Sequence, residues 1–197
     1  MQQQQPAQSA ATRRTFVTDA VSAASAIAIA AAVPAVASAE TVEVPRTTSR
    51  LGGLLEPYSD TGRAFKMFKP LGWNKFDAIP GEYDVKFTDI INPAEILTLS
   101  TTAVKSETTL EALGDVTALG EKLAKGRGAQ LVGARDRRTD GIRFYDLEFV
   151  TERLHVLRTL CVYRGRLWSL EATTTARAWP KREATYRAVV DGFVPRL

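Results

Sequence analysis

Histidine and cysteine are almost absent from this chain of 197 residues, which holds one of each, His155 and Cys161. A histidine base and a cysteine nucleophile must lie within hydrogen-bond reach of each other. On one extended strand these two side chains, six residues apart, are separated by about 20 Å, because each residue adds ~3.3 Å. The sequence also lacks a Gly-x-Ser-x-Gly elbow, a His-Glu-x-x-His pair and a Walker loop. These absences exclude the common catalytic schemes, and we expect a protein that is not an enzyme.

The lone cysteine allows no intramolecular disulfide, and one histidine with one cysteine cannot form a zinc site of ordinary composition. Cys161 stands between Leu160 and Val162, so we expect a buried, unreactive thiol. His155 is predicted to be a structural residue, with titration near neutral pH as the alternative role. A large excess of one charge is missing as well: the net charge is +4, which is too small to argue for nucleic-acid binding.

The first 39 residues have the pattern of an export signal. Arg13 and Arg14 precede an alanine-rich run over residues 20–33, and Ala37-Ser38-Ala39 has the small-x-small form that a signal peptidase recognises. The segment around the two arginines resembles the twin-arginine motif, an export address read by a receptor. A transmembrane anchor needs about 20 strongly apolar residues, which this run does not supply. We predict a cleaved signal over residues 1–39, a flexible arm over residues 40–53 and one domain over residues 54–197.

Two runs of β-forming residues, 154–163 and 166–173, flank Arg164-Gly165 and predict a hairpin with a two-residue turn. In the first run both alternating faces carry apolar side chains, with Leu160 on one face and Leu157 on the other. A strand that is apolar on both faces is covered on both faces, so we expect other layers on each side of this hairpin.

Further strands are predicted over residues 63–69, 82–90, 96–104, 130–135 and 142–150, with a charged turn over residues 136–141. A helix is predicted to begin at Thr108, where Thr108-x-x-Glu111 has the form of a capping box, and to stop at Gly126. A second helix is predicted from Trp179-Pro180 to Gly192. This order of elements indicates an α+β fold, an α-β-α sandwich around a central antiparallel β-sheet.

Charged residues offer two further hypotheses. Three carboxylates in an acidic stretch, Asp60, Asp84 and Asp89, are candidate calcium ligands, with ordinary surface charge as the alternative. Basic side chains that could dock on an acidic protein surface are Arg63, Lys66, Lys69, Arg135, Arg137 and Arg138, with a solvated face as the alternative. Trp73 and Trp179 are predicted to pack in the core rather than to contact a partner.

The chain from about Leu54 to Leu197 resembles the PsbP family of lumenal photosynthetic proteins. The resemblance rests on Gly62-Arg63-Ala64-Phe65, Pro70-Leu71-Gly72-Trp73 and Gly165-Arg166-Leu167-Trp168, followed by Thr173-Thr174-Thr175, Trp179 and Phe193. Family members are similar in fold to an α-β-α sandwich around an antiparallel sheet, which matches the layers inferred above from the residues.

The resemblance implies a non-catalytic, extrinsic protein of the chloroplast thylakoid lumen, peripheral to the lumenal membrane face, that binds photosystem II or a related complex. The best-known family member shields the oxygen-evolving cluster and helps to retain calcium and chloride. This chain departs from that member in its arm over residues 40–50 and in the acidic and lysine-rich loops. It looks more like the PsbP-like and PsbP-domain branches, which are linked to assembly or repair of photosystems.

Two alternatives remain open at this point: a calcium-binding lumenal regulator, and a lumenal subunit of photosystem I assembly or of the chloroplast NAD(P)H dehydrogenase-like complex. No cofactor is expected unless calcium binds. The bacterial branch is usually a lipoprotein, and the absence of cysteine from this signal favours a plant or algal source. Only twelve residues precede Arg13, which is short for an envelope transit peptide and favours a sequence that starts late.

Overall fold

The computed structural model describes residues 55–197, so the predicted signal and arm lie outside the described residues. The strands are β1 (Leu55–Asp60), β2 (Phe65–Pro70), β3 (Asn74–Phe76), β4 (Val85–Thr88), β5 (Ile96–Ala103), β6 (Gln130–Thr139), β7 (Ile142–Val150), β8 (Leu154–Tyr163) and β9 (Arg166–Thr175). The α-helices are α1 (Val116–Arg127) and α2 (Trp179–Asp191), and a 3-10 turn, η1, covers Glu111–Leu113. Neither α-helix of this part of the chain is long and apolar enough to cross a membrane.

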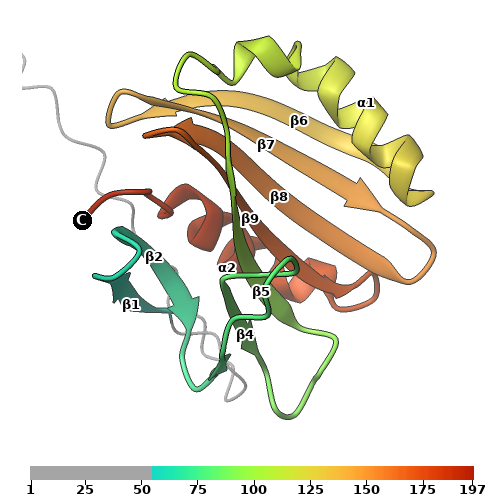
Figure 1. Cartoon of the computed structure of the whole chain (residues 1–197). Helices are drawn as coiled ribbons and strands as arrows, with labels where there is room; N and C mark the ends of the chain where they lie inside the picture. Colours follow the sequence, from blue (N-terminus) through green and yellow to red (C-terminus); the bar gives the residue numbers. More distant parts are fainter. Residues whose placement is uncertain (1–54) are drawn as a thin grey trace, which may run out of the picture. The chain divides into compact units, whose positions relative to one another are not determined.

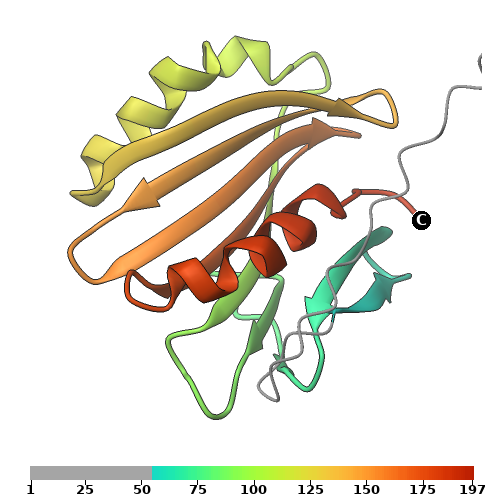
Figure 2. The ribbon, with the colours of Figure 1, turned by 180° about the vertical axis from the view of Figure 1, so that it is seen from behind.

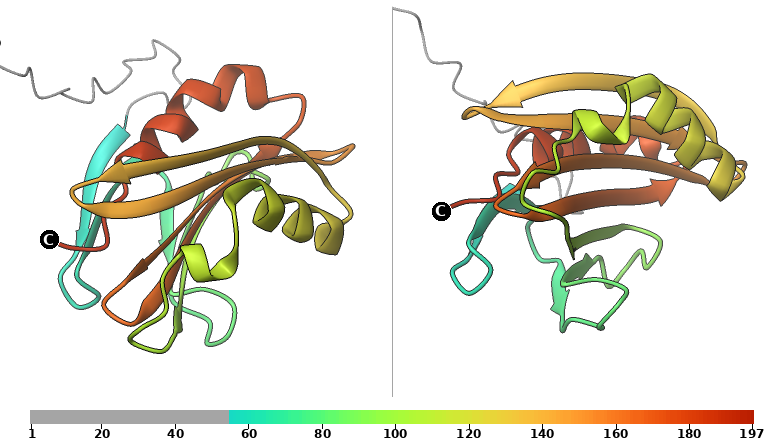
Figure 3. Two further views of the ribbon diagram at one scale, coloured as in Figure 1. Left: turned by 90° about the horizontal axis from the view of Figure 1, so that it is seen from above. Right: turned by 45° about the horizontal axis from the view of Figure 1, so that its top comes forward.

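Seven strands form one antiparallel sheet in the order β3-β4-β5-β9-β8-β7-β6, and β1 and β2 form a separate hairpin (Figure 1). Helix α1 covers one face of the sheet and α2 covers the opposite face, as the view from above shows (Figure 3). The β1–β2 hairpin lies beside α2 on the same side (Figure 2). The predicted α+β sandwich around an antiparallel sheet is therefore confirmed.

The predicted hairpin is formed by β8 and β9, and these strands lie near the centre of the sheet. Arg164 and Gly165 have φ values of 50° and 69°, the left-handed pair that a two-residue type I′ turn requires. Leu157 and Cys161 of β8 are buried in the cluster beneath α2, whereas Val156 and Leu160 are buried in the cluster beneath α1. Each face of this strand thus enters a different hydrophobic core.

The first helix begins later than the capping-box pattern predicts. Asp115, and not Thr108, caps α1: its carboxylate accepts hydrogen bonds from the backbone N–H groups of Thr117 (2.9 Å) and Ala118 (3.4 Å). Gly114, with a φ of 109°, separates this cap from η1. The prediction was also wrong at the other end, because the helix continues to Arg127 and Gly128 takes the left-handed cap position.

The prediction also ended strand β6 too early and omitted two strands. The charged residues 136–138 continue β6, and the turn is only Asp140-Gly141, with φ values of 53° and 78°. Strand β1 and the three-residue β3 were not predicted, because Pro57 and the short length of β3 obscure the alternation that identifies a strand.

Two glycines give a matched test of the packing between α2 and β2. A Cβ at Gly192 would lie 2.4 Å from Cδ2 of Phe68, whereas a Cβ at Gly126 of α1 meets nothing within 4 Å. We expect Gly192→Ala to lower the free energy of unfolding by about 1–3 kcal/mol through overpacking. Gly126→Ala should raise it by about 0.5–1 kcal/mol through helix propensity. Urea denaturation of both variants measures these changes, and equal effects would contradict this account of β2 packing.

Candidate functional site

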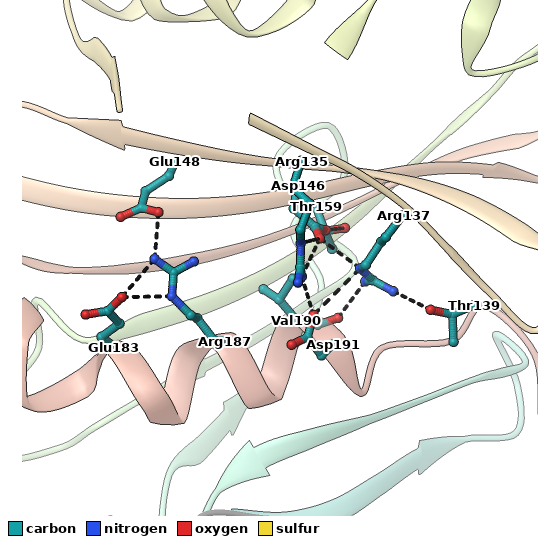
Figure 4. Close-up of polar contacts among 10 residues, drawn as sticks. All are labelled: Arg135, Arg137, Thr139, Asp146, Glu148, Thr159, Glu183, Arg187, Val190 and Asp191. Atoms are coloured by element: carbon teal, nitrogen blue, oxygen red, sulfur yellow. Dashed lines mark hydrogen bonds and ion pairs between the residues drawn. The ribbon is translucent and has the colours of Figure 1, made fainter. Parts of the chain in front are cut away.

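The described residues carry their densest set of ionisable contacts between the sheet and α2. At its centre is the Asp146 carboxylate of β7, whose side chain is 4% exposed. Its Oδ2 accepts hydrogen bonds from Arg135 Nη2 (2.7 Å) and Arg137 Nε (2.8 Å), both on β6. Its Oδ1 accepts a hydrogen bond from the hydroxyl of Thr159 on β8 (Figure 4).

Strand register explains why these side chains meet. Arg135 and Thr159 are the direct cross-strand partners of Asp146 on its two sides. Residues that face each other across antiparallel strands hold their Cβ atoms about 4.5–5.5 Å apart. Arg137 follows Arg135 by two positions, so both arginines lie on the sheet face toward α2.

The same two arginines bind the last turn of α2. Arg137 Nη2 donates to the carbonyl oxygen of Val190 at 2.9 Å, and Arg135 pairs with Asp191. Burial lowers the pKa of Arg135, but hydrogen bonds and charge from Asp146 and Asp191 outweigh that effect and hold the pKa above its ordinary value. Cations at a helix C-terminus also interact favourably with the helix dipole. The network therefore joins three strands to one helix.

A second group of contacts surrounds His155 nearer the start of α2. Its Nε2 lies 2.7 Å from Oε1 of Glu148, and its ring stacks on Trp179 with centroids 3.6 Å apart and planes within 8°. Glu148 also accepts a hydrogen bond from Arg187 at 2.8 Å, and Arg187 pairs with Glu183 one helical turn earlier (Figure 4). His155 and Trp179 are both buried, as predicted for a structural histidine and for a tryptophan that packs in the core.

A third group lies between α2 and β9. Glu95, which is 4% exposed, accepts hydrogen bonds from Tyr186 Oη (2.9 Å) and from Thr174 Oγ1 (3.3 Å), and pairs with Arg182 at 2.9 Å. Burial raises the pKa of Tyr186, and the neighbouring Glu95 carboxylate raises it further. The predicted second helix contains Tyr186, but the sequence gives no sign of its hydroxyl contacts, which Glu95 in the loop before β5 and the carbonyl oxygen of Thr173 on β9 supply.

The space between these groups is small for a ligand site. A cavity of about 200 Å³ between them is lined by Arg135, Asp146, Glu148 and Arg187 among others, which is below the ~300–1,000 Å³ of typical ligand sites. Each of these four side chains is paired with another. Cys161 is buried, and burial raises the pKa of its thiol well above the ordinary value. In residues 55–197 the arrangement therefore cross-links the layers and presents neither an activated nucleophile nor an unengaged histidine base.

The three candidate calcium ligands lie at separate places. Asp60 accepts a hydrogen bond from the backbone N–H of Arg63 (2.9 Å), and Asp84 accepts one from Thr101 Oγ1 (2.8 Å). Asp89 accepts one from the backbone N–H of Ile91 (2.8 Å). Within the part of the chain that the structure describes, no three His, Cys, Asp or Glu side chains form a group that could hold a metal ion.

The predicted docking cations divide into two groups. Arg135 and Arg137 belong to the network described above, Arg63 pairs with Asp60, and Lys69 pairs with Glu56. Lys66 and Arg138 are exposed, and neither forms an ion pair with another described residue. Of the six predicted docking cations, these two are therefore the ones whose side chains remain available to a partner. Arg135 and Arg137 occupy alternate positions of one strand, so their side chains share one face. This spacing is the sequence signal that could have indicated the internal network.

The fold and these contacts define an α+β sandwich whose ionisable groups link its layers, and comparison with known proteins gives the family. The sequence profile of PsbP matches residues 53–194, and the chain belongs to the PsbP family. This membership confirms the resemblance seen in the sequence.

Individual relatives agree with this assignment. The chain is 30% identical to CyanoP of Synechocystis over 168 residues, which cover 75% of this chain and 88% of that protein. It is 27% identical to PsbP-like protein 1, chloroplastic, of Arabidopsis thaliana over 145 residues, which cover 68% of this chain and 62% of that protein. The solution structure of CyanoP from Synechocystis superimposes with a TM-score of 0.62 at 27% identity, covering 76% of this chain and 96% of that one.

Removal of the Asp146 charge tests the central network. Asp146→Asn leaves Arg137, whose side chain is 11% exposed, without its closest counter-charge. Breaking a buried ion pair from one side costs about 3–5 kcal/mol, and we expect a loss of stability in this range by urea denaturation. Glu183→Gln is the control, because the side chains of Glu183 and Arg187 are 43% and 44% exposed and ion pairs at the surface contribute about 0–1 kcal/mol. A loss below that of the control would contradict a central role for Asp146.

The Asp60 contact predicts a pH dependence of stability. Partial burial raises the pKa of Asp60, but hydrogen bonds and charge from Arg63 outweigh that effect and hold the pKa below its ordinary value of 3.8. A lowered folded-state pKa gives stability that is present above the unfolded-state pKa and is lost as pH falls through the folded-state pKa. Asp60→Asn should therefore cost about 0.5–1 kcal/mol at neutral pH and nothing below that lowered pKa. Urea denaturation across acidic pH, with the exposed Asp77→Asn as control, measures the difference.

Proposed function

We propose that this protein is an extrinsic, non-catalytic protein of the thylakoid lumen that binds photosystem II or a related thylakoid complex and serves its assembly or repair. The observation that carries the proposal is the match of the PsbP family to residues 53–194. The internal pairing of Arg135, Asp146, Glu148 and Arg187 supports the non-catalytic part, because these groups stabilise the fold.

The proposed location rests on the first 39 residues. We assign Arg13 and Arg14 to twin-arginine export, with cleavage after Ala39 and residues 40–53 as the arm of the exported protein. The Arabidopsis relative, PsbP-like protein 1, is named as chloroplastic, which supports a chloroplast location for a plant or algal protein.

The partner-binding surface is proposed to include the exposed cations Lys66 and Arg138. Charged groups at the rim of an interface change association more than they change folding, and their effect falls with ionic strength. Binding to the complex should therefore weaken as salt is raised.

Fractionation of thylakoids tests the proposal directly. We expect the protein to co-migrate with photosystem II or another thylakoid complex at low salt and to be released at high salt. Protein that is entirely free in the lumen at low salt would reject it.

Matched charge reversals sharpen this test. Lys66→Glu with Arg138→Glu should increase the released fraction several-fold at low salt, because two attractive contacts become repulsive. Lys122→Glu with Lys125→Glu, which reverses two charges at exposed positions of α1, is the control and should leave release unchanged. Equal release of both variants would remove these two cations from the proposed surface.

A further inference from the structure

The loop between β4 and β5, residues 89–95, has an inverted distribution of polar and apolar side chains. Its two carboxylates, Asp89 and Glu95, are only 8% and 4% exposed. Its two isoleucines, Ile90 and Ile91, are each 68% exposed. A loop in contact with water alone normally exposes its charged groups and covers its large aliphatic ones.

Hydrogen bonds within the loop fix this arrangement. Asp89 accepts a hydrogen bond from the N–H of Ile91 at 2.8 Å, and the N–H of Asp89 donates to the carbonyl oxygen of Glu95 at 3.2 Å. Arg182 of α2 approaches both carboxylates, at 3.8 Å for Asp89 and 2.9 Å for Glu95. The isoleucines are therefore held outward by the loop's own contacts. Figures 1 and 2 show this loop extending beyond the end of the sheet.

Exposed cations stand at the start of α2, the helix whose Arg182 contacts the loop. Lys181, next in sequence to Arg182, and Arg177, which precedes α2 by two positions, are exposed and form no ion pair with another described residue. The exposed positions of the loop itself, residues 90–93, carry no charge.

We propose that this loop contacts an anionic lipid bilayer. Ile90 and Ile91 enter the boundary between headgroups and acyl chains, while Arg177 and Lys181 face the anionic headgroups. Burial of aliphatic side chains together with attraction to anionic lipid is the physical basis of interfacial membrane binding. A projecting tip of two isoleucines fits this role better than a protein interface, which takes about 800 Å² from each partner.

The contact is expected to be weak and reversible. Burial of a mostly exposed isoleucine side chain changes a partition coefficient by roughly tenfold, and each basic residue near an anionic surface contributes roughly fivefold. Such a contact orients the protein on a membrane without anchoring it.

Flotation with vesicles tests the proposal. The full chain is mixed with vesicles of phosphatidylcholine and phosphatidylglycerol in equal parts, or of phosphatidylcholine alone. We expect binding to the anionic vesicles, reduced at least tenfold by Ile90→Asn with Ile91→Asn. Arg177→Gln with Lys181→Gln should lower binding to the anionic vesicles by about 25-fold and leave binding to the neutral vesicles unaffected. Residues 1–54 are common to all variants, so any binding by them cancels in the comparison.

Matched controls exclude general effects of surface change. Leu113→Asn with Val132→Asn removes two exposed aliphatic side chains elsewhere, and Lys122→Gln with Lys125→Gln removes two exposed cations elsewhere. These variants should bind as the unchanged chain does, and urea denaturation verifies that all variants remain folded.

Equal vesicle binding by the loop and control variants, or no vesicle binding by the unchanged chain, would overturn the proposal. Loss of binding to an isolated thylakoid complex with no change in vesicle binding would also overturn it, in favour of a protein partner for the loop. The vesicle assay contains no photosystem, so its outcome is independent of the function proposed above.

Discussion

Strand β8 carries apolar side chains on both faces, and this constraint determines the order of the layers. Leu157 and Cys161 need cover on one side, and Val156 and Leu160 need it on the other. An antiparallel sheet with one wet face cannot satisfy both sets. Helices α1 and α2 therefore pack on opposite faces, and the family fold follows from the burial requirement of one central strand.

The Asp146 network solves a second problem, the alignment of α2 on the sheet. Apolar contacts alone are non-directional, so they do not specify where along the sheet a helix ends. Arg137 contacts Asp146 on the sheet and the carbonyl oxygen of Val190 on the helix, which sets the position of the last turn. Burial of such charges contributes little net stability when it is compared with an apolar alternative. Its contribution here is geometric: the carboxylate and two guanidinium groups fit together in one arrangement of β6, β7 and α2.

The parts of the fold that were predicted depend on local pattern, and the parts that were missed depend on tertiary contact. Arg164-Gly165 and the apolar residues beside it specify a hairpin from sequence alone. The start of α1 was misplaced because Thr108-x-x-Glu111 and Asp115 both satisfy the requirements of a cap, and only packing of the helix on β6 selects the second. Residues 136–138 were assigned to a turn because the partners of Asp136 and Arg137 lie on β7 and α2, far away in the sequence or across the strand pair. For the same reason Arg137 was recognised as a notable cation while its internal role was not.

The two ends of α2 differ in what their ion pairs do: one end orders the core, and the other end shapes an exposed loop. At its C-terminal end Asp146 and Asp191 engage the arginines of β6, so the charges there are paired with one another. At its N-terminal end Arg182 draws the carboxylates of the β4–β5 loop inward, and this contact turns Ile90 outward. Burial of an ion pair costs desolvation energy. Here the ion pairs of Arg182 also keep the exposed side chain of Ile90 in a fixed place. The Arg182 side chain thus links the packing of the interior to the exposure of Ile90 at the surface.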